Sequence, residues 1–598
     1  MKKRFAALAV AATMCAASFG LAACGPKKGN NELWITYFKG GYGSEWVETL
    51  ARKFEEEHEG VKVRTDGDTQ LINSVANMMQ NGTNYDLIFC HDITWEDFVA
   101  PGWIYNLDEL YNTVVDDQGT TFKDRIWDED VLASTRYPDR NGEYHYYKVP
   151  WTIGTAGIAY NVTVMDRIDA WLASPLGQAY LGTQNGHIAG EQDLTRRWQK
   201  TPPKDYYSLF QYCNDIVAAH LAVDPEEATA GTIVPFTWSG VAEEWQWDYV
   251  LFDWWGQLAG PETMNTFKNF GNVNDDFTLN VADQGNPHKE VYDPSRMAVV
   301  RAADGTVDVE ATKAGNNYMG WGEYQQAYQL WYSLVAGNKN WSLNTSKNKI
   351  DSMSKFENEQ AFASGLAAMT PAACWIEYES KTFLERSGQQ VSIMPTPIVS
   401  NVKYDNSGKL LMPYDAAYAT STNVLDAIHA DADATEKVVE INGNKYNRVS
   451  FTSSFGDSVM IPAKSSAKDL AVEFILFMQR EENAKLFTKL SGGTVLPYKY
   501  EYWNSFVENG ENKASLWQQA IFEIDQNSTK FNNYTQHPMM RQTSLRGTAK
   551  MTTIWPKNKY YYLQAWSNPG NSDYTPSGLI SSLYSTVNNE WPLYLSEL

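Results

Sequence analysis

Apolar residues between positions 33 and 90 switch repeatedly between strand-like and helix-like spacing. Short apolar runs alternate with segments in which Val47, Leu50 and Phe54, for example, recur at the spacing of one helix face. Glycine or asparagine pairs punctuate the segments. The expected elements are, in order, a strand at 33–37, a helix between Ser44 as N-cap and Gly60, a strand at 61–64, a helix at 71–79 and a strand at 87–90.

This alternation predicts a parallel, doubly wound sheet in an α/β protein. Ligands bind such sheets beyond the carboxyl ends of the strands, which here are the loops 38–43, 65–69 and 91–95. Lys39 and Tyr42 in the first loop are candidate ligand contacts. Asp92 in the third is another, because a carboxylate there can accept short bonds from two ligand hydroxyls. The alternative is that Asp92 caps a helix that begins near Thr94 or Trp95.

The rest of the chain continues as mixed helix and strand. Residues 139–143 have the composition of a hairpin turn, and strands are expected at 144–149, 157–160 and 458–462. The stretch from about 165 to 450 alternates helical patterns with loops. Helices are expected from Ala467 and from Glu481, the second ending at 492–493. No internal repeat is visible, which disfavours solenoids and propellers.

The first residues have the pattern of a cleaved secretory signal. A basic start at 1–4 precedes an uncharged apolar run at 5–20, which is too short for a membrane span. Leu21-Ala22-Ala23-Cys24 resembles the lipobox of bacterial lipoproteins, in which the cysteine is lipidated and becomes the new amino terminus. We therefore expect a signal peptide at 1–23, lipidation of Cys24 and a polar tether at 24–32, which holds the protein on the outer face of the membrane. The alternative is an ordinary signal peptide with an incidental cysteine.

Charge and cysteine content narrow the function further. The formal charge is −23 and becomes −26 when the three basic residues of the signal are removed, so nucleic acid and anionic membrane surfaces are disfavoured as partners. Only Cys90, Cys213 and Cys374 remain outside the signal region. Their odd number and wide spacing indicate buried thiols rather than a disulfide framework.

Aromatic residues make up 14% of the chain, with 22 Trp and 35 Tyr. Rings with a polar edge suit ligands such as sugars, which combine an apolar face with a rim of hydroxyls, although most of these rings must fill the core. Trp151, Trp238 and Trp375 are the candidates for a sugar-binding cleft, with a core position as the alternative for each. Two carboxylates, Glu244 and Asp457, are weaker candidates, for which a surface position is the favoured interpretation.

Together these segments resemble the extracellular solute-binding proteins of carbohydrate ABC importers, the family that includes the maltose-binding proteins. The five places that carry the resemblance are 33–38 with its glycine-rich loop, 85–92, 147–161, 356–375 and 460–463 with its helix. The resemblance implies two α/β lobes joined by crossing segments, with the ligand held between them and a permease as partner. A hinge between the lobes would let ligand contacts from both sides favour a closed state.

The same resemblance implies how the chain divides. Residues 31–147 and 450–500 would form lobe one, and 148–449 with 501–598 an enlarged lobe two. The chain is longer than is usual in this family, so parts of 165–330 and the region after 500 are expected to be insertions.

Other functional classes have weaker support. His91 invites a metal site, but none of the eight histidines has the i, i+4 spacing of a zinc motif. No phosphate-binding loop is present, so neither a metal nor a cofactor is expected. A secreted glycoside hydrolase would need two carboxylates, for which Glu243, Glu244 and Asp248 are conceivable. A surface glycan-binding adhesin is a third possibility.

Overall fold

The computed structural model describes residues 28–531, apart from the gaps listed at the end of this sentence: 30, 92, 128, 184–185, 187–197, 199–200, 227–230, 240–246, 261–302, 305–321, 336–340, 348–351, 406–409, 412–414, 416, 418–420, 422–437, 442 and 452–456. Of the residues singled out above, Cys24, Asp92, Glu243 and Glu244 lie outside the described residues, as does the predicted signal segment. For Asp248 only the backbone is described.

A five-stranded sheet with strand order β2-β1-β3-β16-β6 organises the first lobe. Strand β1 runs parallel to both β2 and β3, as expected, whereas β16 runs antiparallel to β3 and β6. The strands are β1 (Glu32–Phe38), β2 (Lys62–Asp68), β3 (Leu87–Cys90), β6 (Val149–Pro150) and β16 (Ser458–Met460). The strands and helices expected between residues 33 and 90 are therefore confirmed in order and type.

Helices cover both faces of this sheet because β3 sends alternate apolar side chains to each side. Leu87 and Phe89 pack in one core with α2 (Glu45–Glu57), α17 (Lys468–Met478) and α18 (Glu481–Leu490). Ile88 and Cys90 pack in another core with α3 (Leu71–Asn81) and the 3-10 helix η1 (Trp95–Phe98). The remaining helices of this part are α4 (Asp108–Asn112), η2 (Lys123–Arg125) and α5 (Glu129–Ala133).

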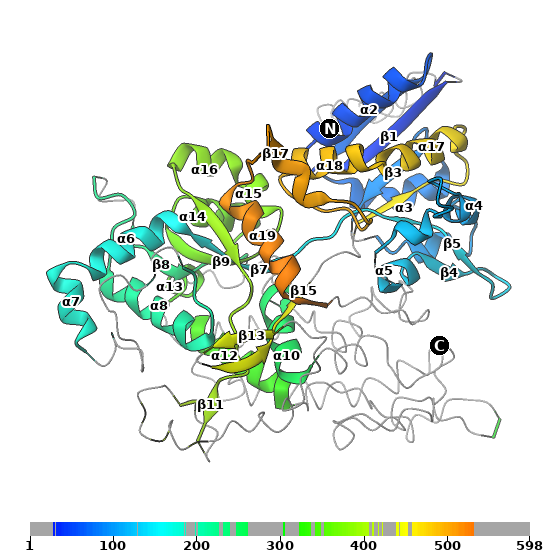
Figure 1. Ribbon diagram of the computed structural model, residues 1–598. Coiled ribbons are helices and arrows are strands. Elements are labelled where there is room, and N and C mark those ends of the chain that lie inside the picture. Colours follow the sequence, from blue (N-terminus) through cyan, green and yellow to red (C-terminus); the bar gives the residue numbers. More distant parts are fainter. Residues whose placement is uncertain are drawn as a thin grey trace, which may run out of the picture.

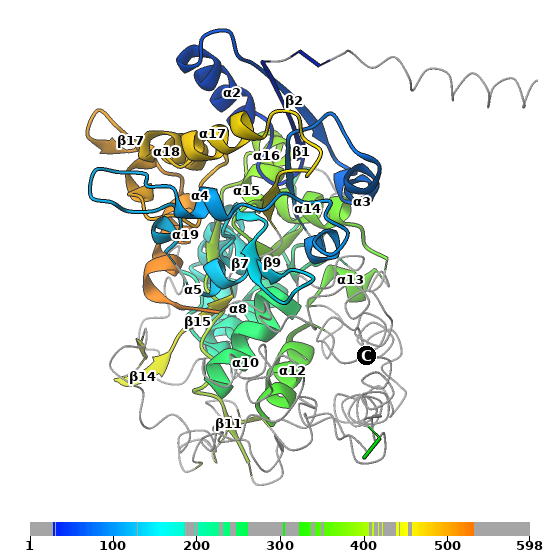
Figure 2. The same ribbon diagram turned by 90° about the vertical axis from the view of Figure 1, so that its right-hand side faces the viewer.

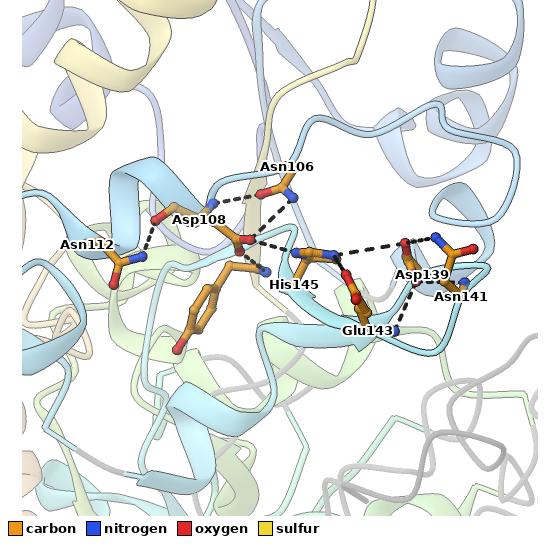
Figure 3. A network of polar contacts seen from close by, with 8 residues as sticks. Asn106, Asp108, Asn112, Asp139, Asn141, Glu143 and His145 are labelled. Atoms are coloured by element: carbon orange, nitrogen blue, oxygen red, sulfur yellow. Dashed lines mark hydrogen bonds and ion pairs between the residues drawn. The ribbon is translucent and has the colours of Figure 1, made fainter.

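The predicted hairpin turn at 139–143 joins β4 (Arg136–Pro138) to β5 (Tyr144–Tyr146). Asp139 holds the turn by accepting the backbone N–H groups of Asn141 at 2.8 Å and Glu143 at 3.0 Å. Next to the turn, Nδ1 of His145 lies 2.6 Å from Oδ2 of Asp108 (Figure 3). The other oxygen of Asp108 accepts the Tyr146 N–H at 2.9 Å, so one carboxylate ties the start of α4 to the hairpin.

A buried carboxylate connects the amino-terminal end of the described chain to this lobe. Asp86, fully buried before β3, accepts the Trp34 N–H at 2.8 Å and the Ser465 hydroxyl at 2.7 Å. Lys28 forms an ion pair with the same carboxylate. Lys28 is thereby fixed to the first lobe.

A four-stranded sheet with strand order β10-β7-β9-β8 organises the second lobe. It is mixed, since β7 runs antiparallel to β9 and β10 while β8 runs parallel to β9. Its strands are β7 (Ala156–Asn161), β8 (Val234–Phe236), β9 (Ala367–Ala373) and β10 (Val391–Met394). The Asn161 side chain accepts the Val164 N–H at 3.0 Å and so begins the helix that follows β7.

Helices from widely separated parts of the chain pack around the second sheet. Figure 1 shows most of them as cyan and green ribbons, with the last of them in orange beside the sheet, apart from α2, α17 and α18 of the first lobe. The helices are α6 (Val162–Leu172), α7 (Pro175–Leu181), α8 (Tyr206–Ala219), η4 (Trp247–Leu251), α10 (Phe252–Ala259), α12 (Gly322–Val335), α13 (Leu343–Ser346), α14 (Lys355–Ala363), α15 (Ile376–Glu379), α16 (Lys381–Ser387) and α19 (Leu516–Asn527).

Short paired strands complete the described chain. They are β11 (Lys403–Tyr404) with β12 (Leu410–Leu411), β13 (Val438–Ile441) with β14 (Asn444–Asn447), β15 (Val449–Phe451) with β19 (Thr529–Phe531), and β17 (Val507–Glu508) with β18 (Glu511–Asn512), which follows the 3-10 helix η7 (Tyr502–Phe506).

Two of the expected lobe boundaries fall at different residues in the structure. Val149–Pro150, expected in lobe two, forms β6 and extends the first sheet through its pairing with β16. Residues 450–451, expected in lobe one, belong to β15, which pairs with β19, and its Val449 packs in the core of the second sheet. Register with a neighbouring strand, which the sequence does not display, decides both positions.

The three cysteines outside the signal region are buried as free thiols. Burial raises the pKa of the Cys374 thiol to about 12, so it is protonated at neutral pH. Within the described ranges no helix is both long and apolar enough to cross a membrane.

Candidate functional site

The loop after β1 meets the segment after β6 and the residue before β16 at one edge of the first sheet. The Tyr42 hydroxyl donates to Oδ2 of Asp457 at 2.5 Å and lies 3.0 Å from Oγ1 of Thr152. The Thr152 hydroxyl also donates to Asp457. β1 and β6 end at this edge and β16 begins there, so the sheet itself brings the three side chains together.

Burial raises the pKa of the Tyr42 phenol well above its usual value, and the negative charge of Asp457 raises it further. The hydroxyl therefore remains protonated and can only donate to the carboxylate beside it. An ionised carboxylate has about four lone-pair positions, so Asp457 can accept further bonds in addition to those from Tyr42 and Thr152. This corner of the site is suited to hydroxyl or amide groups of a ligand.

The same loop contacts the second lobe. The Gly41 N–H donates to Oε1 of Glu379 at 2.9 Å, and this oxygen also accepts a bond from Lys355 at 2.8 Å. Glu379 ends α15, which directly follows β9, and Lys355 begins α14. Figure 2 shows α15 on the side of the second lobe that approaches the first. One short loop thus has hydrogen bonds to both lobes.

Tyr378 fits between two glycines of the first lobe. A Cβ on Gly43 would lie 2.4 Å from the Tyr378 hydroxyl, and one on Gly492 would lie 3.2 Å from its ring. Gly43 has φ +68° and Gly492 has φ +77°, a backbone region that favours glycine. Both the backbone conformation and the close approach of the lobes therefore require glycine at position 43.

Carboxylates gather on the second-lobe side of this contact. Burial raises the pKa of Glu359, and the charge of Glu379 raises it further, whereas Lys355 at 3.7 Å lowers it. Burial also raises the pKa of Glu377 to about 7, although the Ser515 hydroxyl, which donates to it at 3.1 Å, opposes the shift. The raised pKa values of Glu359 and Glu377 favour their protonated forms, which can donate as well as accept hydrogen bonds.

Trp375 lies beside the glycine-rich loop. It is half-buried, and a Cβ added to Gly41 would lie 3.6 Å from the Cβ of Trp375. Its ring meets the Tyr249 ring edge-on, with the centroids 6.1 Å apart. Of the three tryptophans proposed for the cleft, Trp375 is the one that the described contacts place between the lobes.

The prediction that Trp151 and Trp238 share this cleft is wrong. Trp151 is 5% exposed and packs in the core of the first sheet, where its ring centroid is 4.8 Å from those of Phe89 and Phe487. Trp238 is 0% exposed and lies in the core of the second sheet. The Asn344 side chain fixes the Trp238 backbone by accepting its N–H at 3.1 Å and donating to its C=O at 2.8 Å.

The remaining predicted residues have mixed positions. Tyr42 and Asp457 lie in direct contact, as described above. The Lys39 side chain is exposed, and its backbone N–H donates to the Asp68 C=O at 3.1 Å. Asp92 and Glu244 lie outside the described residues, and His91 packs edge-on against Phe38 with centroids 4.0 Å apart. Among the described residues, no group of three or more His, Cys, Asp or Glu is arranged to hold a metal ion.

Sequence reasoning missed Thr152, Lys355, Glu359 and the acidic turn 377–379. A signal for the turn was present, because Trp375-Ile376-Glu377-Tyr378-Glu379 directly follows the apolar strand β9. The rule that polar residues at strand ends bind ligands applies to this strand as it does to β1. Lys355 had no such signal, since it begins a helix that reaches the site only through packing.

Comparison with known proteins gives one family match and a set of distantly similar solved structures. Residues 39–329 match the model of the bacterial extracellular solute-binding protein family. No curated protein matches the chain. One similar solved structure is RafE from Streptococcus pneumoniae, at 13% sequence identity, with 94% of this chain and 99% of that chain covered and a TM-score of 0.49. Another is the GacH receptor of Streptomyces glaucescens, at 14% identity, with 94% of this chain and 98% of that chain covered and a TM-score of 0.48. The maltose-maltodextrin binding protein of Alicyclobacillus acidocaldarius is similar at 10% identity, with 93% and 99% coverage and a TM-score of 0.47.

Proposed function

We propose that the chain captures an oligosaccharide between its two lobes and delivers it to an ABC transporter permease, because residues 39–329 match the model of the bacterial extracellular solute-binding proteins. The ligand is released chemically unchanged, so the protein is not an enzyme. Residues 31–150 with 457–500 form the first lobe in this proposal, and the second sheet with its helices forms the other.

The observation that carries the proposal is the double attachment of the loop after β1. Tyr42 bonds to Asp457 within the first lobe, and Gly41 bonds to Glu379 of the second. A ligand that contacts both groups stabilises the approach of the lobes, because it gains more contacts in the closed state than in the open one. The crossing segment after Pro150 acts as the hinge in this proposal.

Carbohydrate is the ligand class that suits these side chains. Carboxylates and neutral phenols form short, directional bonds to hydroxyl groups, and the half-buried Trp375 offers a ring for the apolar face of a sugar. The proposed contacts are Lys39, Tyr42, Asp92, Thr152, Glu244, Trp375, Glu379 and Asp457. Trp151 packs in the core of the first sheet next to Thr152 and is not a contact itself, and Trp238 is not part of the set.

Substitution of the Tyr42 hydroxyl tests this site. In Tyr42→Phe the ring remains but the donor to Asp457 is lost, and we expect the affinity for the bound oligosaccharide to fall about tenfold or more, as for a charge-assisted bond. The ligand is first found by thermal shift over a panel of oligosaccharides, and affinities are then measured by calorimetry. Tyr144→Phe, at an exposed position of β5, is the matched control and should bind like the wild type.

Two outcomes would contradict the proposal. No stabilisation by any oligosaccharide of the panel would exclude the ligand class. Conversion of the bound oligosaccharide into shorter products would favour the glycoside hydrolase.

We also propose that Cys24 carries the lipid that anchors the protein outside the cell, on the basis of the Leu21-Ala22-Ala23-Cys24 sequence. Cys24→Ser should abolish acylation, and the protein should be released into the medium or remain unprocessed. Mass spectrometry of the wild-type amino terminus checks the assignment. A wild-type protein that is secreted freely with a different first residue would refute it.

A further inference from the structure

A pocket of about 230 Å³ lies between the lobes on a different set of residues from the Tyr42 site. Trp127 and Val495 line it from the first lobe, and Phe522 and Asp525 of α19 line it from the second. Ile153 of the crossing segment forms part of the wall and is bridged to Val495, whose C=O accepts its N–H at 2.8 Å. The pocket therefore adjoins the hinge and shares no lining residue with the contacts proposed above.

Most of the pocket wall is aromatic or aliphatic. The Phe522 ring lies 5.4 Å from that of Tyr502, measured between centroids. The Lys530 ammonium lies over the Trp127 ring, 4.2 Å from its centroid, and this contact joins β19 to the first lobe. An apolar ring face that enters the pocket would be removed from water on several sides.

Two of the polar side chains that line the pocket, Tyr502 and Lys530, meet at Asp525, whereas Lys499 donates to the Asp124 C=O at 2.9 Å. Its carboxylate forms an ion pair with Lys530 and accepts the Tyr502 hydroxyl. Burial raises the pKa of Tyr502 and the charge of Asp525 raises it further, so this hydroxyl stays a donor. Because Lys530 neutralises the Asp525 carboxylate, this ion pair offers no net charge to a charged ligand. The carboxylate still has lone pairs for the hydroxyls of a neutral ligand.

We propose that this pocket is a second ligand site that binds one neutral sugar ring. The volume suits a single ring rather than an oligosaccharide, the walls suit its apolar face, and Asp525 suits its hydroxyls. Ligand pockets commonly combine apolar walls with a few convergent polar groups in this way. Since the walls come from both lobes, occupancy of the pocket depends on the angle between them and shifts it in return.

Crystals of the full mature chain soaked in millimolar D-glucose, D-galactose or D-mannose provide the first test. We expect density for one ring against Asp525 and Phe522. Ligand-observed NMR then gives the affinity in solution for wild type, Asp525→Asn and Val495→Phe. Asp525→Asn should bind about tenfold or more weakly, because it loses a charged acceptor. Val495→Phe, which places a ring in the pocket, should abolish this binding.

Glu523→Gln is the matched control, because Glu523 is exposed on the same helix and does not line the pocket. It should bind like the wild type. No density in the pocket for any of the three sugars, density only at the Tyr42 site, or equal affinity of Asp525→Asn and wild type would each overturn the proposal. Oligosaccharide binding that is lost in Tyr42→Phe but kept in Val495→Phe separates this site from the proposed transport site and shows that the pocket variant is folded.

Discussion

Replacement of Trp151 with alanine should lower the free energy of unfolding by about 3–5 kcal/mol, the usual cost of removing a large aromatic side chain from a core. The side chain is 5% exposed, and its ring centroid is within about 5 Å of those of Trp46, Phe89 and Phe487. No rearrangement of these rings can fill so large a void without strain. Urea unfolding followed by circular dichroism gives the measurement.

Trp171→Ala is the control for this experiment. Trp171 is half-buried on α6, so its replacement should lower the free energy of unfolding clearly less than Trp151→Ala does. The comparison separates a core role from a ligand-binding one. If Trp151→Ala unfolded at wild-type urea concentrations and lost only its affinity for oligosaccharide, the ring would belong to the binding surface, and our assignment to the core would be wrong.

Replacement of Gly43 with alanine should separate the lobes. The new methyl group would lie 2.4 Å from the Tyr378 hydroxyl, and alanine at φ +68° adds about 1–2 kcal/mol of backbone strain. The lobes can relieve the clash only by moving apart or by displacing Tyr378. We expect a larger radius of gyration by small-angle scattering and at least a tenfold loss of oligosaccharide affinity, equivalent to about 1.4 kcal/mol.

Two further variants isolate the steric part of this effect. Gly142→Ala has a similar positive φ, +84°, but its Cβ would meet nothing within 4 Å, so it should leave the radius unchanged. Tyr378→Ala combined with Gly43→Ala removes the clash and should restore the wild-type radius. A Gly43→Ala protein with unchanged radius and affinity would show that Tyr378 moves aside at little cost and does not control the approach of the lobes.

The order of elements in the first lobe could be predicted because each has one dominant periodicity. β3 is four apolar residues long, which is too short for a buried helix, and α2 has an apolar stripe at helical spacing, so each pattern favours one structure. The expected strand at 87–90 matches the observed one, whereas the helix expected to reach Gly60 ends at Glu57. Helix ends are set by individual hydrogen bonds, which the periodicity does not determine.

The binding site was less predictable because side-chain direction at a strand end changes with each residue. Trp151 and Thr152 are neighbours, yet the first packs in the core and the second bonds to Asp457. A shift of one residue would exchange their roles, and composition alone favours the tryptophan. Gly41 and Glu379 are 338 residues apart, so their contact depends on how the lobes pack, and no local pattern predicts it.

The ion pair between Lys28 and Asp86 determines which half of the protein would stay still during transport. If Cys24 carries the lipid, only three residues lie between it and Lys28, whose side chain is fixed in the first lobe, and these four Cα–Cα steps span at most about 14 Å. That lobe would then stand against the bilayer as a fixed base, and the second would swing over it. A partner in the membrane would then contact the first lobe at a nearly constant distance from the bilayer. Ligand binding would reach that partner as a change in the orientation of the second lobe.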